Sequence, residues 1–508
     1  MFVKVLSAAN LGLETAGVDV EVNIASKGLP VFEIVGLPNK AVDESKERVK
    51  TAVINSGFDF PSRRIIINLA PGDLPKEGSF YDLPIAVGIL ALVTNCKLPK
   101  SLFFGELSLQ GSLRHTRGAL LMSLFAREKG IESIFVPKQS ANEAAIIRGI
   151  KVYPVENLNQ LIAHFSGRAQ IKPAEYKERK ISREKAAEFD MAEVLGQEQA
   201  KRAMEIAAAG AHNLIMTGSP GSGKTMLARA LPGILPELKE KESLEVTKIY
   251  SASGRIPPNG SLITTRPFRA PHHIISQVGL IGGGVNPKPG EISLAHRGVL
   301  FLDEFTEFPR SIKEALRQPL EDGHLVISRS RARVDYPSRF ILIASSNPCP
   351  CGYLFHPKKA CICTKREIEK YRKRVSGPIL DRIDLHVDVP VVDIKKLSEE
   401  QKKERFLESS DKVRKRVARA RERQGKRFSK ERIFTNAEMK NSHIKEHCPL
   451  SKKTKQLLSR VGSDLNLSAR SYFKIIKIAR TIADLEDADN IAVSNIAEAL
   501  QYRPDLKS

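Results

Sequence analysis

Tryptophan is absent from this sequence of 508 residues, and aromatic residues make up only 6% of it. None of them interrupts the basic stretch Lys412–Arg423, so base stacking on aromatic side chains is not expected there. The 6 cysteines do not suggest a disulfide scaffold in a chain of this length. In a reducing compartment, clustered cysteines would instead indicate a metal site.

Long hydrophobic runs are also missing. No stretch of about 18 apolar residues occurs, so we expect no membrane-spanning helix. The first residues, Met1 to Val5, lack the charged and then apolar pattern of a secretion signal. We therefore expect a cytoplasmic protein with no membrane segment.

Positive charge is abundant: the sequence contains 81 Lys and Arg residues and 58 Asp and Glu residues, which gives a formal net charge of +23. Such an excess favours polyanions such as DNA as partners through long-range attraction. Charge alone leaves open a basic surface that binds no nucleic acid. The length indicates about two to four domains.

Composition divides the chain into four parts. Residues 1–166 mix helical segments with strands such as Val18–Ile24, which alternates with period two. Residues 167–190 are rich in charge and poor in large apolar residues, which is typical of a solvated linker. Residues 191–395 form a second α/β region, and residues 396–508 are helical and very basic at their start. The predicted fold class is α/β with a helical C-terminal part.

A glycine-rich loop marks a phosphate site. It follows the apolar strand Asn213–Thr217 and precedes a helical segment, which is the setting that the G-x-x-x-x-G-K-[ST] motif requires. Glycines let backbone N–H groups surround phosphate oxygens, and the helix N-terminus adds a partial positive charge. We expect Lys224 to bridge the β- and γ-phosphates of ATP and Thr225 to ligate Mg²⁺. The loop comprises Gly218, Ser219, Pro220, Gly221, Ser222, Gly223, Lys224 and Thr225.

Two further apolar strands end in polar residues that suit ATP hydrolysis. Val299–Leu302 is followed by Asp303, expected to bind near the metal, and by Glu304, expected to orient and deprotonate the attacking water. The strand Phe340–Ala344 leads to Asn347, whose amide could hold that water. An ordinary turn before Pro348 is the alternative for Asn347.

These elements resemble the AAA+ ATPases. Gly377–Leu385 looks like the segment that carries the arginine finger in the replicative-helicase and magnesium-chelatase branch. That resemblance implies that Arg382 reaches the γ-phosphate held by a neighbouring subunit. Leu467–Arg470 resembles the second sensor of the helical lid, which implies that Arg470 contacts phosphate bound by its own chain. A helix-end salt bridge for Arg382 and a capping or surface role for Arg470 stay open.

Three longer segments, Arg266–His273, Pro289–Arg297 and Asn347–Gly352, look like the YifB/ComM family of magnesium-chelatase-like competence proteins of bacteria. The resemblance covers nearly the whole chain. It implies a hexamer that drives branch migration of DNA strands and helps to integrate incoming DNA during natural transformation. The spacing of His272 and His273 does not suggest a metal site, and we interpret them as part of a structural loop.

Four cysteines gather just after the strand that precedes Asn347. The set Cys349, Cys351, Cys361 and Cys363 has the ligand number of a closed tetrahedral zinc site. We therefore predict structural Zn²⁺, with free thiols as the alternative and His356 as an alternative ligand.

For residues 1–166 the family resemblance implies a fold like the Lon protease domain (ribosomal protein S5 domain 2-like). Pro75–Leu83 looks like the nucleophile segment of that protease and places Phe80 at the serine position. Gly105–Gly118 looks like the segment leading to its lysine and places Leu120 at the lysine position. A Ser–Lys dyad is therefore missing, and we expect an assembly or substrate-guiding domain without proteolytic activity.

A basic hairpin is the candidate DNA contact. Arg329, Arg331 and Arg333 share one side of a predicted strand because side chains alternate with period two. In related helicases a hairpin at this place lines a central pore, and copies of these arginines could follow phosphates regardless of sequence. A solvated hairpin face or pairing between subunits is the alternative.

Three functions remain to be compared. The first is an oligomeric DNA motor, the second a magnesium-chelatase-type ATPase that remodels a partner protein, and the third a Lon-type protease. The positive charge, the arginine hairpin and the Lon-like domain favour the first, and the missing dyad disfavours the third.

Overall fold

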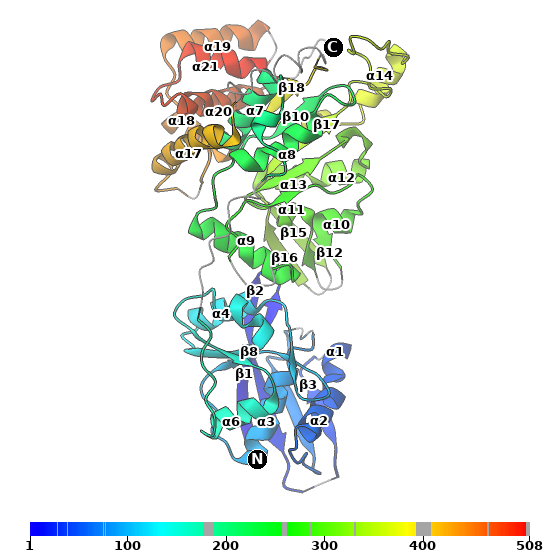
Figure 1. Cartoon of the computed structure of the whole chain (residues 1–508), viewed down its shortest axis with the longest axis vertical. Coiled ribbons are helices and arrows are strands. Elements are labelled where there is room, and N and C mark those ends of the chain that lie inside the picture. The colour runs from blue at the N-terminus through cyan, green and yellow to red at the C-terminus, as the bar shows by residue number, and fades with distance from the viewer. Residues whose placement is uncertain are drawn as a thin grey trace.

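The computed structural model describes residues 1–27, 29–37, 39–74, 76, 78–175, 187–256, 262–284, 287–329, 332–392, 408–431, 433–464 and 467–503. The molecule is elongated: an N-terminal α/β domain at one end, a central α/β domain, and a helical lid beside the far end of the central domain (Figure 1). Among the helices of these ranges, none has both the length and the apolar content needed to cross a lipid bilayer. The expected α/β class with a helical C-terminal region is confirmed.

The N-terminal domain is built on a seven-stranded mixed sheet in the order β3-β4-β2-β1-β5-β8-β9. Its strands are β1 (Phe2–Leu11), β2 (Glu14–Ile24), β3 (Phe32–Val35), β4 (Ile65–Ala70), β5 (Leu102–Phe103), β8 (Ser133–Pro137) and β9 (Lys151–Val155), and β6 (Glu106–Leu107) pairs separately with β7 (Leu113–Arg114). The helices are α1 (Lys40–Asp43), α2 (Ser45–Asn55), α3 (Asp82–Thr94), α4 (Ala119–Glu128), α5 (Ala141–Ala144) and α6 (Leu158–Phe165). The apolar helix α3 is buried against β1 and β2, which explains why its sequence shows no polar face.

The positions aligned with a protease dyad hold packed apolar side chains. Phe80 lies 4.6 Å from Tyr81 and 5.0 Å from Phe104, centroid to centroid. Leu120 is fully buried. The neighbouring hydroxyl of Ser79 donates to the carboxylate of Glu106, so its partner is not a lysine. Neither aligned residue can supply the nucleophile or the base.

The central domain contains a five-stranded sheet in the order β11-β14-β17-β10-β18, and all its pairs are parallel. Its strands are β10 (Leu214–Thr217), β11 (Phe268–Arg269), β14 (Val299–Leu302), β17 (Ile341–Ser346) and β18 (Leu385–Asp388). The short continuous apolar runs of β14 and β17 are completely buried, as expected for a parallel sheet covered on both faces. Because the strands are parallel, their carboxyl ends meet at one edge of the sheet.

The helices of the central domain are α7 (Glu198–Gly210), α8 (Lys224–Ile234), α9 (Glu240–Ser253), α10 (Gln277–Ile281), α11 (Glu291–Leu294), α12 (Arg310–Ala315), α13 (Arg317–Asp322), α14 (Lys365–Arg372) and α15 (Gly377–Leu380). Two hairpins project from it, β12 (Gly282–Gly283) with β13 (Lys288–Pro289), and β15 (His324–Arg329) with β16 (Ala332–Pro337). The expected linker, residues 167–190, is only partly described, since residues 176–186 lie outside the described ranges.

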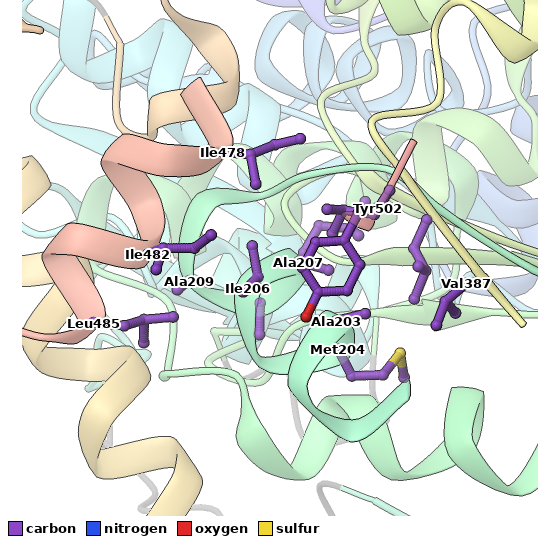
Figure 2. Close-up of a cluster of buried hydrophobic side chains, with 14 of the residues drawn as sticks. Ala203, Met204, Ile206, Ala207, Ala209, Val387, Ile478, Ile482, Leu485 and Tyr502 are labelled. Atoms are coloured by element: carbon purple, nitrogen blue, oxygen red, sulfur yellow. The ribbon is translucent and has the colours of Figure 1, made fainter. Parts of the chain in front are cut away.

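The lid consists of α17 (Ser410–Arg427), α18 (Asn441–His447), α19 (Lys452–Asp464), α20 (Ala469–Leu485) and α21 (Val493–Gln501). Figure 2 shows Ile478, Ile482 and Leu485 of α20 next to Ile206 and Ala209 of α7, and these five side chains belong to one buried cluster. Small alanines on α7 let the two helices approach closely. The lid therefore shares a hydrophobic core with the central sheet.

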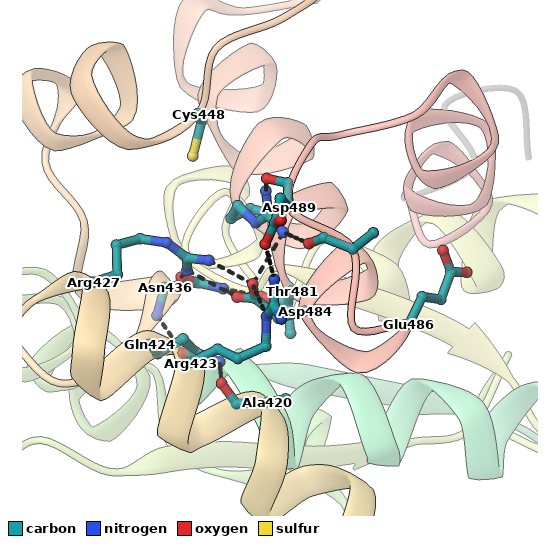
Figure 3. Close-up of polar contacts among 12 residues, drawn as sticks. Ala420, Arg423, Gln424, Arg427, Asn436, Cys448, Thr481, Asp484, Glu486 and Asp489 are labelled. Carbon is teal, nitrogen blue, oxygen red and sulfur yellow. Dashed lines mark hydrogen bonds and ion pairs between the residues drawn. The ribbon is translucent and has the colours of Figure 1, made fainter.

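A buried polar network fixes the lid helices to one another (Figure 3). The carboxylate of Asp484 accepts from Arg427 at 2.5 and 2.9 Å and from Asn436 Nδ2 at 2.9 Å. Gln424 accepts from the backbone N–H of Asn436 at 2.9 Å and donates to the carbonyl of Ala209 at 3.0 Å. The last bond reaches α7, so the network continues from the lid into the central domain.

The N-terminal domain contacts the central domain at the outer half of the arginine hairpin, toward its tip. A Cβ atom built on Gly12, in the turn between β1 and β2, would lie 2.1 Å from Cγ1 of Val334 on β16. Helix α4 also packs against α9, and Ser251 donates to Glu143 at 2.6 Å. The turn between β1 and β2 of the N-terminal domain therefore supports the outer half of the hairpin.

Candidate ATP-binding site

The glycine-rich loop connects β10 to α8 at the carboxyl edge of the central sheet. Gly221 and Gly223 have φ of +76° and +92°, which L side chains rarely adopt. A Cβ atom at either residue would meet no neighbour within 4 Å, so the space beside both glycines is open. Such consecutive turns, followed by a helix N-terminus, form an anion-binding cradle. The conformation of the loop is therefore compatible with the predicted triphosphate site.

Lys224 begins α8 and turns its side chain into this loop. Its Nζ donates to the carbonyls of Gly218 and Ser219 at 2.6 and 3.0 Å, and lies 3.4 Å from Oδ1 of Asn347. Burial lowers the pKa of Lys224, while the carboxylates of Asp303 and Glu304 oppose that shift. Asn347 is therefore brought to the phosphate loop by the pairing of β17 with β10.

Thr225 and Asp303, the two residues predicted to lie at the metal, are in direct contact. The Thr225 hydroxyl donates to Oδ2 of Asp303 at 2.9 Å, and Ser345 donates to the other carboxylate oxygen. A hydroxyl and a carboxylate are hard oxygen ligands, which Mg²⁺ prefers beside phosphates. The two groups lie beside Lys224, so the donor set fits a magnesium–triphosphate complex.

Glu304 is held in an unusual backbone conformation with φ of +53°. Its N–H donates to Ser345 Oγ at 3.1 Å, which fixes the turn, and its side chain is 56% exposed. The carboxylate oxygen Oε2 lies 3.5 Å from Nδ1 of His273. His273 follows β11, which neighbours β14, so both residues lie at the same carboxyl edge. The sequence did not reveal this contact, because no local spacing links the two residues.

Arg382 and Arg470 lie at the other end of the sheet. The backbone oxygen of Arg382 accepts from Nδ2 of Asn213 at 3.2 Å, and Asn213 directly precedes β10, whereas the phosphate loop follows it. Four strand residues span about 13 Å. Both guanidinium groups bind one carboxylate, that of Glu321, and Arg470 does so at 3.0 Å. Together they line a cavity of about 900 Å³ between core and lid.

This placement differs from the expectation for Arg470. The lid packs at the amino end of β10, so Arg470 lies with Arg382 and away from the phosphate loop of its own chain. The sequence motif identified the residue but could not show on which side of the sheet the lid packs. Glu321 was missed for the same reason.

The cysteine loop forms a compact sulfur cluster. The Sγ atoms of Cys349, Cys351 and Cys361 lie 3.4, 3.6 and 3.7 Å apart in pairs, and Cys363 completes a group within 4.8 Å. His356 is not part of this group, and its Nδ1 instead accepts from the N–H groups of Lys358 and Lys359. The cysteines therefore come together as a group of four.

The arginine hairpin is only partly described. Arg333 is exposed and pairs in register with Ser328. The side chain of Arg329 and the whole of Arg331 lie outside the described residues. The structure therefore describes the side chain of only one of the three predicted arginines.

Comparison with known proteins decides the family. The chain is 41% identical over 508 residues to the competence protein ComM of Haemophilus influenzae, covering 98% of this chain and 97% of that protein. It is 42% identical over 501 residues to the protein YifB of Escherichia coli, covering 97% and 96%. The chain belongs to the YifB/ComM family.

Family models for the magnesium chelatase subunit ChlI match three parts of this YifB/ComM protein, namely residues 20–140, 190–397 and, for the C-terminal part, 407–503. The 38 kDa magnesium-chelatase subunit of Rhodobacter capsulatus is 27% identical over 178 residues, covering 32% of this chain and 50% of that subunit. The YifB/ComM chain is thus a magnesium-chelatase-like AAA+ ATPase.

Proposed function

We propose that this protein is an ATP-driven DNA motor that assembles as a ring, with six subunits by the family resemblance, and moves DNA branch points. The observation that carries the proposal is the separation, within one subunit, of the phosphate loop from the two arginines. Lys224, Thr225 and Asp303 gather at one edge of the sheet. Arg382 and Arg470 gather at the opposite edge.

A site in which the phosphate loop and the arginines lie at opposite edges of one subunit would be completed by an adjacent subunit. A guanidinium near the γ-phosphate stabilises charge on the transferring phosphoryl group. In this chain neither Arg382 nor Arg470 reaches its own loop, so each would act on the nucleotide of an adjacent subunit. Hydrolysis would then be coupled to assembly, as a rotating or sequential motor requires.

At the phosphate loop, each residue has a chemical task. Mg²⁺ would neutralise phosphate charge, held by Thr225 and Asp303. Glu304 would accept a proton from the attacking water, and Asn347, within 3.4 Å of Lys224, would hold that water near the γ-phosphate. His273 would keep the Glu304 carboxylate in place.

DNA is the proposed substrate because of charge and position. The net charge is +23, and exposed Arg333 lies on a hairpin that the N-terminal domain supports. Contacts from arginines to phosphates are independent of sequence, which suits movement along DNA. The ComM relative is named a competence protein. By this likeness the motor would act on DNA taken up during natural transformation.

Zinc is proposed for the cysteine cluster. Four thiolates within 4.8 Å of one another suit a closed tetrahedral site. Its task would be structural, since all four positions would be filled by protein.

The experiment is ATP-dependent displacement of a labelled strand from synthetic three- and four-way junctions. We expect displacement by the wild type with ATP, and none by Lys224→Ala or with a non-hydrolysable analogue. A wild type that hydrolyses ATP but leaves every junction intact would contradict the DNA function.

The alternative is a chelatase-type ATPase that remodels a partner protein, favoured by the match of residues 190–397 to the ChlI family model. ATPase stimulation distinguishes the two. Branched or single-stranded DNA should stimulate turnover if the protein is a DNA motor, whereas stimulation by a partner protein alone would favour the remodeller.

A further inference from the structure

The cysteine loop touches the phosphate loop through a glycine. Gly352 has φ of +82°, and its N–H donates to the carbonyl of Cys349 at 3.0 Å. A Cβ atom at Gly352 would lie 2.6 Å from Cδ of Pro220, well inside contact distance. The backbone of the cysteine loop therefore packs directly on Pro220, a residue of the phosphate loop.

The sulfur positions suit a single ion. A tetrahedron of thiolates with Zn–S bonds of about 2.3 Å has S···S edges of about 3.8 Å. The pairs among Cys349, Cys351 and Cys361 are 3.4–3.7 Å apart, only slightly shorter than these edges. Cys349 is completely buried, so one ligand is part of the protein interior. The other three are partly exposed, which gives an ion access.

Both ends of the cysteine loop are tied to the nucleotide site. At the first end, Cys349 is separated from Asn347 only by Pro348, and the preceding Ser346 accepts from the N–H of Gly218 at 3.2 Å. At the second end, Thr364 caps helix α14, and Tyr371 of that helix bonds Thr306 at 2.6 Å, two residues after Glu304. The loop thus spans from the sensor strand to the turn that carries the proposed base.

We propose that a zinc ion bound by the four cysteines clamps the phosphate loop, so that nucleotide affinity depends on metal occupancy. The inference rests on the proposed ATP site. With the ion, the thiolates are held together and Gly352 stays pressed on Pro220. Without it, the four sulfurs are no longer tied to one point, chain entropy loosens the loop, and Pro220 and Asn347 lose their support.

Three variants separate the steps. In Cys361→Ser with Cys363→Ser, two outer ligands are removed while buried Cys349 remains. Gly352→Ala keeps all four thiols but places a Cβ against Pro220 at a positive φ. Cys96→Ser, in the N-terminal domain, removes a thiol outside the cluster and is the matched control. Each full-length protein is measured for zinc by mass spectrometry and for binding of a fluorescent ADP with Mg²⁺ present.

We expect about one zinc per chain in the wild type and in Cys96→Ser, with equal nucleotide affinity. The double cysteine variant should lack zinc and bind ADP at least about tenfold more weakly, and Gly352→Ala should keep zinc yet bind weakly. If the double variant fails to fold, zinc is removed from the wild type with a chelator that does not bind magnesium, and zinc is then added back. Affinity should fall and recover.

The clamp would be overturned if metal-free protein bound ADP as tightly as metal-replete wild type. It would also be overturned if wild-type protein with reduced cysteines contained no zinc. If metal-replete wild type binds no nucleotide, both the clamp and the proposed ATP site are overturned. Normal nucleotide binding without metal overturns the clamp only.

Discussion

Arg470 of the lid and Glu321 of the central domain form an ion pair at 3.0 Å, and the same carboxylate also forms an ion pair with Arg382. The hydrogen bond from Arg382, with the charges of both arginines, lowers the pKa of Glu321. One acidic side chain therefore holds two arginines from different domains side by side. Their joint position, opposite the phosphate loop, supports action on a neighbour.

Mixing two defective proteins tests this arrangement. Arg382→Ala should lower ATP turnover by about a thousandfold while leaving nucleotide affinity nearly unchanged, because the arginine serves another subunit. Lys224→Ala should bind nucleotide poorly but keep its arginines. Mixed rings should hydrolyse ATP faster than either variant alone. Mixtures no faster than the mean of the separate variants would contradict a role across subunits.

Arg333 should contribute to DNA binding by pairing with a phosphate. We expect Arg333→Ala to weaken binding of all sequences alike and to make the slope of log affinity against log salt shallower by about one, because one fewer phosphate is neutralised. Exposed Arg63 of the N-terminal domain provides a matched control, Arg63→Ala. Equally weakened binding in both variants, measured by fluorescence anisotropy at several salt concentrations, would show that only net charge matters.

Asp484 should be essential for the stability of the lid. Its side chain is completely buried and pairs with Arg427 and Arg480, so Asp484→Asn leaves buried charge uncompensated. We expect a loss of about 3 kcal/mol in the free energy of unfolding. Asp489→Asn removes an acid that is 91% exposed and should change it by less than about 1 kcal/mol. Denaturant unfolding of both variants measures the difference, and equal effects would refute the buried network.

His296 makes stability depend on pH. Burial lowers its pKa to about 4, while its Nε2 lies 3.1 Å from Glu245 and its Nδ1 accepts from the N–H of Arg339. Between about pH 6.5 and 4 the unfolded chain binds a proton that the folded chain does not. The free energy of unfolding therefore falls as the pH falls, by about 3 kcal/mol across that window.

His296→Gln can keep both hydrogen bonds without titrating. Unfolding curves between pH 7 and 4 should therefore be flatter for this variant than for the wild type. Parallel pH dependence in the two proteins would assign the acid sensitivity to other groups.

The phosphate loop could be proposed from sequence patterns because its residues are contiguous and its strand–loop–helix setting, which the structure shows, is local. Asp303 and Asn347 could also be proposed from sequence, since each directly follows an apolar strand. The contacts His273–Glu304 and Arg470–Glu321 were not, because they depend on strand order and on how the lid packs. The sequence grouped the four cysteines, but Pro220 as their neighbour required the three-dimensional structure.

ATP turnover by the purified wild type, with and without branched DNA, tests the central claim most directly. We expect hydrolysis that DNA stimulates, a loss of about a hundredfold or more in Glu304→Gln with ATP still bound, and loss of binding in Lys224→Ala. Unchanged turnover in both variants, or a folded wild type that neither binds nor hydrolyses ATP, would contradict the account.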